Sequence, residues 1–271
     1  MTLNKAIILG VPVNSSSGDL LLEEITNLAS KKGHKSIIFT PNPEFLVEAQ
    51  KDQRFKELLN KSDINLPDGI GLVWAGKVLG EQICMRVSGA DVVEELLEKG
   101  NKQQATGNRQ QGTGNSHERW RVGIAGARKG DTSDLKILFA NLSKKYPNIC
   151  FVSLDPNFQF SIPIPSADSG QVFQISNFKF QIVLACQGMK KQEQSIWENK
   201  DCIEANVFMG IGGSLDFLGG FTKRAPLFLR KCGLEWFWRV MQKPSHIKRI
   251  WKAVFVFGWL VLKERLIKRE T

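Results

Sequence analysis

The strongest constraint on the fold is an alternation of short apolar runs with helix-like segments, which continues to about residue 220. Strand-like runs such as KAIILGVPV (5–13), SIIFT (36–40) and FQIVLACQG (180–188) are separated by segments with apolar residues at helical spacing. Several runs are apolar throughout, which is typical of parallel strands buried on both faces. The sequence therefore predicts an α/β fold, a Rossmann-like mostly parallel sheet with helices on both faces.

Local signals place some boundaries within this pattern. Asn42 and Pro43 have the residue types of an N-cap and a first helical position, and they predict one helix over 43–62. Ser88 and Asp91 have the spacing of a capping box for a helix that ends near Gly100. The segment 99–118, KGNKQQATGNRQQGTGNSHE, is nearly free of apolar residues and predicts a mobile low-complexity loop.

The alternation stops after Gly220, which predicts a body over residues 1–220 and a helical appendage over 221–271. The appendage has thirteen Lys and Arg against three Asp and Glu, so it accounts for the whole formal charge of +10. It also contains four of the seven tryptophans, and Pro244 predicts a break between two helices. This asymmetry indicates an anionic partner, either nucleic acid or a membrane surface.

Composition argues against several classes of protein. Five scattered cysteines with no Cys-x-x-Cys pair indicate reduced thiols in the cytosol, without a disulfide framework or a zinc site. The N-terminal sequence has no signal-peptide pattern. The longest apolar run, 253–262, has ten residues, whereas a membrane-spanning helix needs about 20. We therefore expect no transmembrane segment.

Common cofactor motifs are absent. The Gly-rich segments 123–131 and 210–215 match neither a dinucleotide fingerprint nor a P-loop, and ordinary strand-to-helix turns explain them better. The three histidines are far apart in sequence, and neither Asp-x-Asp nor a Gly-x-Ser-x-Gly elbow occurs. We expect no metal and no cofactor.

Polar residues collect where predicted strands give way to helices: Thr40 and Asn42, then Asp68, Arg86 and Gln192. Ligands of such sheets bind outside the carboxyl ends of the strands, where helix N-termini offer N–H groups to anions. These residues together predict a pocket for a phosphate-bearing ligand. Local roles remain open: Thr40 can end a strand, Asn42 can cap a helix, Gln192 can face solvent, and the triplet around Asp68 is a good turn.

Three long segments, 40–80 (TPNPEF…LPDGIG…), 86–100 (RVSGADVVEELLEKG) and 211–244 (IGGSLDFLGGFTKRAP…), resemble the WecG/TagA/CpsF glycosyltransferases. The resemblance covers most of the chain outside the segment 99–118 and a second irregular, Pro- and Ser-rich connection at 154–170. It implies transfer of an N-acetylmannosamine-type sugar, or a related one, from a UDP-sugar donor to a polyprenyl-diphosphate-linked sugar, with inversion, in cell-surface polysaccharide biosynthesis.

The resemblance also implies roles for individual residues. The catalytic base of the family falls on Asp68, with Thr40 and Asn42 as further catalytic positions. The substrate-binding positions that it implies fall on Arg86, Gln192, Arg224, Arg230 and Arg239.

The chain departs from the family pattern GLGxPKQE at 186–193, where it reads CQGMKKQE. Cys186 replaces the first glycine and Lys190 replaces the proline, which puts the conformation of this turn in question.

The implied chemistry needs a base for the acceptor hydroxyl and positive charge for the departing diphosphate. Without an Asp-x-Asp, arginines and helix N-termini would supply that charge, independently of metal. A basic aromatic helix suits the headgroup layer, so residues 245–271 are expected to bind an anionic membrane from the cytoplasmic side, as a peripheral protein on the inner face of a bacterial membrane. Self-association of the tail in the absence of a membrane is left open.

Two other classes of function remain as alternatives. One is a catalytically silent, membrane-associated sugar-nucleotide-binding protein, which the departures at Cys186 and Lys190 motivate. The other is a basic nucleic-acid-binding protein, which would show strongly salt-dependent affinity. No nucleic-acid-reading motif accompanies the charge, so we expect no nucleic-acid partner.

Overall fold

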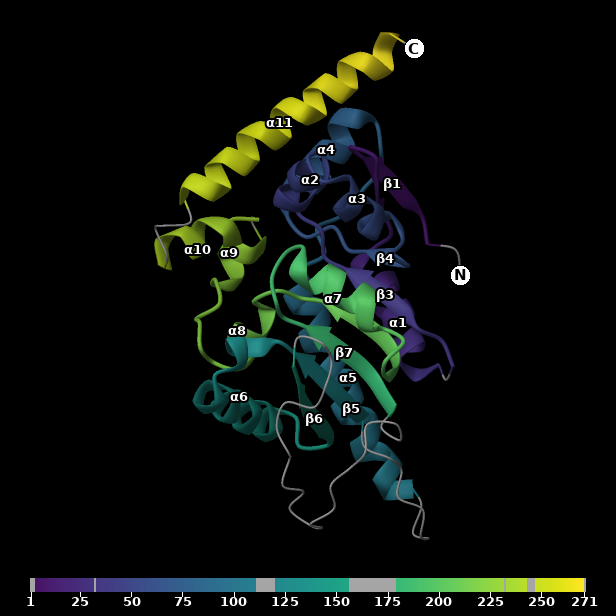
Figure 1. The fold of residues 1–271 in the computed structure, drawn as a ribbon, viewed down its shortest axis with the longest axis vertical. Coiled ribbons are helices and arrows are strands. Elements are labelled where there is room, and N and C mark those ends of the chain that lie inside the picture. The colour runs from purple at the N-terminus through teal and green to yellow at the C-terminus, as the bar shows by residue number, and fades with distance from the viewer. Residues whose placement is uncertain are drawn as a thin grey trace. The chain divides into compact units, whose positions relative to one another are not determined.

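The computed structural model describes residues 3–31, 33–110, 120–155, 179–231, 233–242 and 247–270 (Figure 1). The chain divides into two compact units, which are described separately below. Unit 1 comprises Met1–Leu21, Phe39–Gly89 and Lys223–Thr271, and unit 2 comprises Leu22–Ile38 and Ala90–Thr222. The C-terminal segment therefore belongs to the same unit as two N-terminal segments. The predicted division, by contrast, had one body over residues 1–220 and a separate appendage over 221–271.

The main sheet has the strand order β4-β3-β8-β7-β5-β6. All four pairings along the row from β3 to β6 are parallel; in one register Ile182 of β7 lies opposite Val207 of β8 and Val122 of β5. The prediction of an α/β fold with a parallel sheet is confirmed. Its strands are β3 (Ser36–Phe39), β4 (Ile64–Asn65), β5 (Trp120–Ala125), β6 (Ile149–Leu154), β7 (Lys179–Ala185) and β8 (Glu204–Gly210).

Helices cover the strands of unit 2. Helix α6 (Thr132–Lys145) packs against β6, and α7 (Lys191–Asn199) packs against β7 and β8. Phe180, Val183, Val207 and Phe208 are fully buried, because parallel strands with helices on both faces expose neither side. The remaining elements here are α1 (Gly18–Ser30), α5 (Gly89–Gln110), η1 (Ala127–Gly130) and α8 (Ser214–Leu218).

The predicted loop over 99–118 is wrong in its first part, since α5 continues to Gln110; residues 111–118 lie outside the described residues. Gly100 looks like a helix end, yet it lies inside α5. A Cβ at this position would come within 2.4 Å of the ring of Trp120. Glycine therefore serves close packing of α5 on β5 here, and the Gln-rich sequence that follows, NKQQATGNRQ, can continue the helix.

The predicted single strand over 5–13 is instead a hairpin in unit 1. Strands β1 (Lys5–Ile8) and β2 (Val11–Asn14) pair antiparallel, and the two residues between them, Leu9 and Gly10, have φ of 53° and 73°. Two positive φ values are typical of a type I′ turn. Tertiary partners satisfy the turn: the N–H of Leu9 donates to Glu264 at 3.0 Å, and its carbonyl accepts from Gln50 at 2.9 Å.

The predicted helix over 43–62 is divided in two. Asn42 caps α2 (Pro43–Ala49) as expected, and its Oδ1 accepts from the N–H groups of Glu44 and Phe45 at 2.9 and 3.2 Å. A second cap, Asp52, starts α3 (Gln53–Asn60). The break lets the rings of Phe45 and Phe55 meet with their centroids 5.6 Å apart.

The C-terminal segment of unit 1 forms α9 (Leu227–Lys231), α10 (Glu235–Gln242) and α11 (Ile247–Glu270). Pro244, predicted to separate two helices, lies outside the described residues, between α10 and α11. Helix α11 packs on α2 and α4 (Ile70–Leu79) through the buried side chains of Ala253, Phe257 and Val261. The ring of Phe257 lies 6.5 Å from that of Trp74 in α4.

Candidate active site

Three segments of unit 1 are joined by backbone hydrogen bonds at the carboxyl end of β3. The N–H of Leu66 donates to Phe39, and the N–H of Asp68 donates to Pro41, at 2.8 and 3.0 Å. The N–H of Val87 donates to Pro67 at 3.0 Å. These bonds bring the backbone around Thr40, Asn42, Asp68 and Arg86 to one place, and the pocket predicted from these positions stays a prediction.

Asp68 lies in the turn between β4 and α4. The next residue, Gly69, has φ of 112°, a conformation that L-residues with side chains rarely adopt. The turn presents the carboxylate of Asp68, which is partly accessible with 27% of its side chain exposed, and Nε of Arg86 lies 3.7 Å from its Oδ1. The same residues thus form a tight turn and hold the Asp68 carboxylate in a partly exposed position.

Arg86 is held mainly by the C-terminal segment. Its Nη2 donates to Oε2 of Glu235 at 2.6 Å, and its Nη1 donates to the carbonyl of Arg230 at 3.2 Å. Only 15% of the Arg86 side chain and 5% of the Glu235 side chain are exposed. Charge-assisted hydrogen bonds at such short distances are among the stronger polar contacts in proteins.

Thr40 and Asn42 both have local structural roles. Thr40 is buried, and a Cβ on Gly89 would lie 2.7 Å from its Cγ2, so the first residue of α5 must be small. Asn42 uses its side-chain oxygen to cap α2. The capping role of Asn42 is therefore established, and its catalytic role stays a prediction.

The other predicted cations of unit 1 come from the C-terminal segment. Arg224 precedes α9 and Arg230 lies within it, and both are half-buried. The carbonyl of Lys223 accepts from Trp238 at 3.1 Å and from Gln242 at 2.8 Å, which fastens α10 to the chain beside Arg224. Arg239 lies in α10, and its side chain is outside the described residues.

Gln192 belongs to unit 2, in the first turn of α7, and it is buried rather than exposed to solvent. Its Oε1 accepts from the N–H of Gly212 at 2.8 Å, and its Nε2 donates to Glu193 at 2.6 Å. The second oxygen of Glu193 accepts from the N–H of Lys190 at 2.7 Å. Burial raises the pKa of Glu193 to about 7, although these hydrogen bonds oppose the rise.

The two departures from the family pattern have a structural consequence. Lys190 has φ of 72°, which a proline ring cannot adopt, and it uses an N–H that proline lacks. The turn after β7 therefore has a conformation that excludes proline. Desolvation, with a smaller effect of Asp216, raises the pKa of the Cys186 thiol above its usual range, so this cysteine is no thiolate nucleophile.

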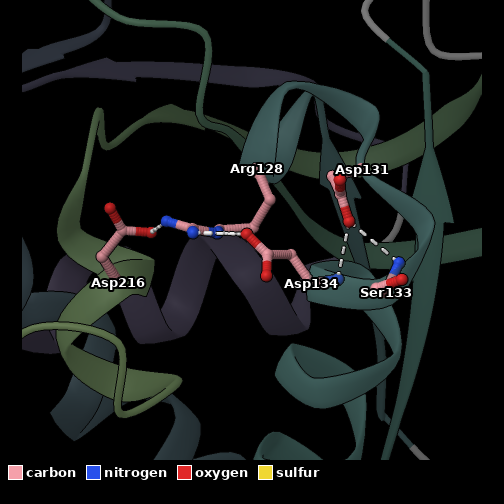
Figure 2. A network of polar contacts seen from close by, with 5 residues as sticks. All are labelled: Arg128, Asp131, Ser133, Asp134 and Asp216. Atoms are coloured by element: carbon pink, nitrogen blue, oxygen red, sulfur yellow. Dashed lines mark hydrogen bonds and ion pairs between the residues drawn. The ribbon is translucent and has the colours of Figure 1, made fainter.

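The Gly-rich turns after β5 and β8 are joined by an ion-pair network (Figure 2). Arg128 donates from Nε and Nη2 to Asp134 in α6, and from Nη1 to Asp216 in α8 at 3.2 Å. Its guanidinium also lies over the ring of Phe221, 4.2 Å from the centroid. The hydrogen bond with Asp134 raises the pKa of Arg128. The Gly-rich segment 123–131 is therefore a structural turn, which Arg128 connects to α6 and α8.

Helix α11 has two apolar faces. Ala253, Phe257 and Val261 are buried, whereas Trp251, Phe255 and Trp259, two positions away in each case, are 58–61% exposed. Two positions correspond to about 200° around a helix, so the exposed aromatic residues lie opposite the packed face. The exposed face continues toward the C-terminus with Lys263, whereas Lys268 turns to the packed side, where its Nζ lies 3.7 Å from Glu81 and 3.5 Å from Glu264. No helix in the described ranges has a stretch both long and apolar enough to cross a bilayer.

Three charged residues of these clusters were not among the predicted site residues: Arg128, Glu193 and Glu235. Glu193 stands next to the predicted Gln192, so the segment alone could have suggested it. Glu235 and Arg128 belong to no recognisable sequence motif. Their importance follows only from their ion pairs with Arg86 and Asp216, which are distant in sequence.

A parallel α/β sheet, with Asp68 and Arg86 paired at the carboxyl end of β3, fits an enzyme that acts on a phosphate-bearing substrate. The family model "Glycosyl transferase WecG/TagA/CpsF family" matches residues 6–271, and the chain belongs to this family.

Among its relatives is the N-acetylglucosaminyldiphosphoundecaprenol N-acetyl-beta-D-mannosaminyltransferase of Bacillus subtilis (strain 168), 29% identical over 234 residues, which are 86% of this chain and 82% of the relative. The protein of the same name from Staphylococcus aureus (strain MW2) is 28% identical over 267 residues, 98% of this chain and 95% of the relative.

Proposed function

We propose that this chain is an inverting glycosyltransferase that moves an N-acetylmannosamine-type sugar from a UDP-sugar to a polyprenyl-diphosphate-linked sugar. The names of its relatives support the sugar and the acceptor, since both are N-acetylmannosaminyltransferases that act on N-acetylglucosaminyl-diphosphoundecaprenol. The observation that carries the proposal is the partly exposed carboxylate of Asp68, presented by a glycine-dependent turn with Arg86 at 3.7 Å.

In this mechanism Asp68 takes the proton of the acceptor hydroxyl as that oxygen attacks the anomeric carbon. The bond from this carbon to the UDP oxygen breaks on the opposite face, which inverts the configuration. A cation close to Asp68 favours its ionised form, the form that can accept a proton. Thr40 and Asn42 border the same turn and would contact the sugar or the acceptor.

The departing diphosphate needs positive charge, and the sequence has no Asp-x-Asp to bind a metal for this purpose. We assign this role to the arginines of the C-terminal segment, Arg224, Arg230 and Arg239, as preorganised electrostatic stabilisers. Gln192, with its buried amide fixed by Gly212, would contribute to donor binding. Activity is then expected to persist in EDTA.

The exposed aromatic and basic face of α11 supports peripheral binding to an anionic membrane, on its cytoplasmic side, where a lipid-linked acceptor is within reach. Tryptophan and phenylalanine suit the headgroup boundary, and Lys263 and Arg265 suit anionic headgroups. The proposed function thus joins a soluble donor to an acceptor held in the bilayer.

The test is release of UDP from a panel of UDP-N-acetylhexosamines and UDP-glucose, with a short-chain N-acetylglucosaminyl-diphosphate lipid as acceptor, in EDTA. Loss of the general base is expected to reduce turnover by about 10²–10⁴-fold in Asp68→Asn. The control is Asp63→Asn, a change at an exposed aspartate close by in the same unit, which should leave turnover within about twofold.

Turnover of Asp68→Asn near that of the unmodified chain would refute the role of the base. Binding of UDP without release from any donor would favour the alternative, a sugar-nucleotide-binding protein without activity.

A further inference from the structure

Glu235, the first residue of α10, is an acidic group buried in a region dominated by cations. The residue is 4% exposed, and its carboxylate accepts the 2.6 Å hydrogen bond from Nη2 of Arg86. Burying a carboxylate is costly unless it is paired and hydrogen-bonded. The ion pair with Arg86 therefore offsets the cost of burying the Glu235 carboxylate. How this pair affects the neighbouring Asp68 is a separate question.

Within the described residues, the guanidinium of Arg86 contacts Glu235, Arg230 and Asp68. Nη2 donates to Glu235, Nη1 donates to the carbonyl of Arg230 at 3.2 Å, and Nε lies 3.7 Å from Oδ1 of Asp68. A guanidinium is planar and rigid, so bonds at both terminal nitrogens determine where Nε is. The distance from Nε to Asp68 suits an ion pair but exceeds the length of a hydrogen bond.

Asp68 and Glu235 thus compete for one cation. In a direct, bidentate pair with Arg86, the oxygens of Asp68 would be occupied, and the carboxylate would become a weaker base. At 3.7 Å the cation still favours the ionised form of Asp68, while 27% of the Asp68 side chain stays exposed to an acceptor hydroxyl. The short hydrogen bond from Nη2 to Glu235 keeps Arg86 on Glu235 and away from direct contact with Asp68.

We propose that Glu235 is a positioning residue that holds Arg86 at ion-pair distance from Asp68 and prevents a direct hydrogen-bonded pair. This inference rests on the proposed role of Asp68 as the base. It places the control of the base in the C-terminal segment, because α10 supplies Glu235 and α9 supplies the carbonyl of Arg230. Of the described charged residues, the variants below change only Asp68, Arg86 and Glu235, and they leave the cations Arg224 and Arg230 unchanged.

The direct test is the titration of the Asp68 carboxyl, followed by NMR in the full chain labelled with ¹³C at aspartate Cγ and assigned with Asp68→Asn. In Glu235→Gln, Arg86 has lost the carboxylate that holds its Nη2 at 2.6 Å and should move onto Asp68, which shifts the titration midpoint to lower pH by about 1 unit. Arg86→Ala should shift it in the opposite direction by a similar amount. If Glu235→Gln does not fold, Glu235→Met also removes the charge at similar length and carries the same prediction.

The double variant separates positioning from a general structural effect. If Glu235 acts through Arg86, adding Glu235→Gln to Arg86→Ala should leave the midpoint within about 0.3 pH unit of that of Arg86→Ala alone. In the transfer assay, Glu235→Gln should lower kcat by about tenfold with the KM of the donor within about twofold, because a weaker base slows proton removal more than donor binding.

The inference would be overturned if the midpoint in Glu235→Gln did not move or moved to higher pH. It would also be overturned if Glu235→Gln shifted the midpoint equally in the Arg86→Ala background. The NMR titration does not depend on turnover, so these outcomes count whether or not the chain transfers sugar. Turnover by Asp68→Asn would instead refute the proposed function and leave the titration result standing.

Discussion

At the scale of single residues, glycines show how one signal in the sequence can have opposite meanings. Gly69 lies in a turn with φ of 112°, where its missing side chain permits the backbone conformation. Gly100 lies inside α5 with helical neighbours, where its missing side chain makes room for the ring of Trp120. Both look like helix or strand breakers in the sequence, and only the first is one.

This difference predicts that Gly100→Ala destabilises the protein although alanine is the better helix former. The helix-propensity gain is about 1 kcal/mol, whereas overpacking against Trp120 costs about 1–3 kcal/mol, so the net effect should be a loss of about 1 kcal/mol. The measurement is the urea unfolding midpoint followed by circular dichroism.

The matched control is Gly258→Ala in the middle of α11, where nothing lies within 4 Å of the added Cβ. It should stabilise the protein by about 0.5–1 kcal/mol. Equal effects of the two substitutions would contradict the packing role of Gly100.

At the scale of elements, the start of α7 depends on a buried carboxyl. Glu193 accepts hydrogen bonds from Lys190 and Gln192, and burial raises its pKa from 4.5 to about 7 in the folded protein. Since the folded state holds this proton more tightly than the unfolded state, the contribution of Glu193 to stability is largest below pH 4.5 and is lost as the pH rises to about 7.

Glu193→Gln should remove this dependence, because glutamine does not titrate. Between pH 4.5 and pH 7.5, the free energy of unfolding of Glu193→Gln relative to the unmodified chain should rise by about 3 kcal/mol. At low pH the variant should be less stable by about 1 kcal/mol, since one hydrogen bond is lost. Chemical unfolding at several pH values tests this, and a constant difference would mean that Glu193 is not protonated near neutral pH.

At the scale of the whole molecule, the positive charge and the tryptophans are concentrated in a segment whose last helix packs by one face only. The packed face of α11 meets α2 and α4, and the opposite face exposes Trp251, Phe255 and Trp259. Deleting the helix would also expose its packing site on α2 and α4, so substitutions on the outer face are the sharper test of membrane binding.

We expect the combined variant Trp251→Ser, Phe255→Ser and Trp259→Ser to lose most of its affinity for anionic vesicles, while its thermal stability is unchanged within about 1 kcal/mol. Sedimentation with vesicles that contain phosphatidylglycerol, at low and high salt, measures the affinity. The control is Ile137→Ser in α6, a 50% exposed apolar residue outside this face, and this variant should bind like the unmodified chain. Undiminished binding of the triple variant would contradict the proposed membrane face.

The sequence by itself determined the parallel α/β class, the cap at Asn42, the turn at Asp68 and the family, because these depend on local residue types and on the period of apolar positions. Three features of the fold depended on the tertiary structure: the hairpin at Leu9–Gly10, the break before Asp52 and the continuation of α5 past Gly100. The hairpin turn is stabilised by the distant partners Gln50 and Glu264, and α5 packs on the distant Trp120 at Gly100. The break is local in sequence, but it depends on the packing of Phe45 against Phe55. The same reason applies to the candidate site, where Glu235 acquires its meaning only beside Arg86, 149 residues away along the chain.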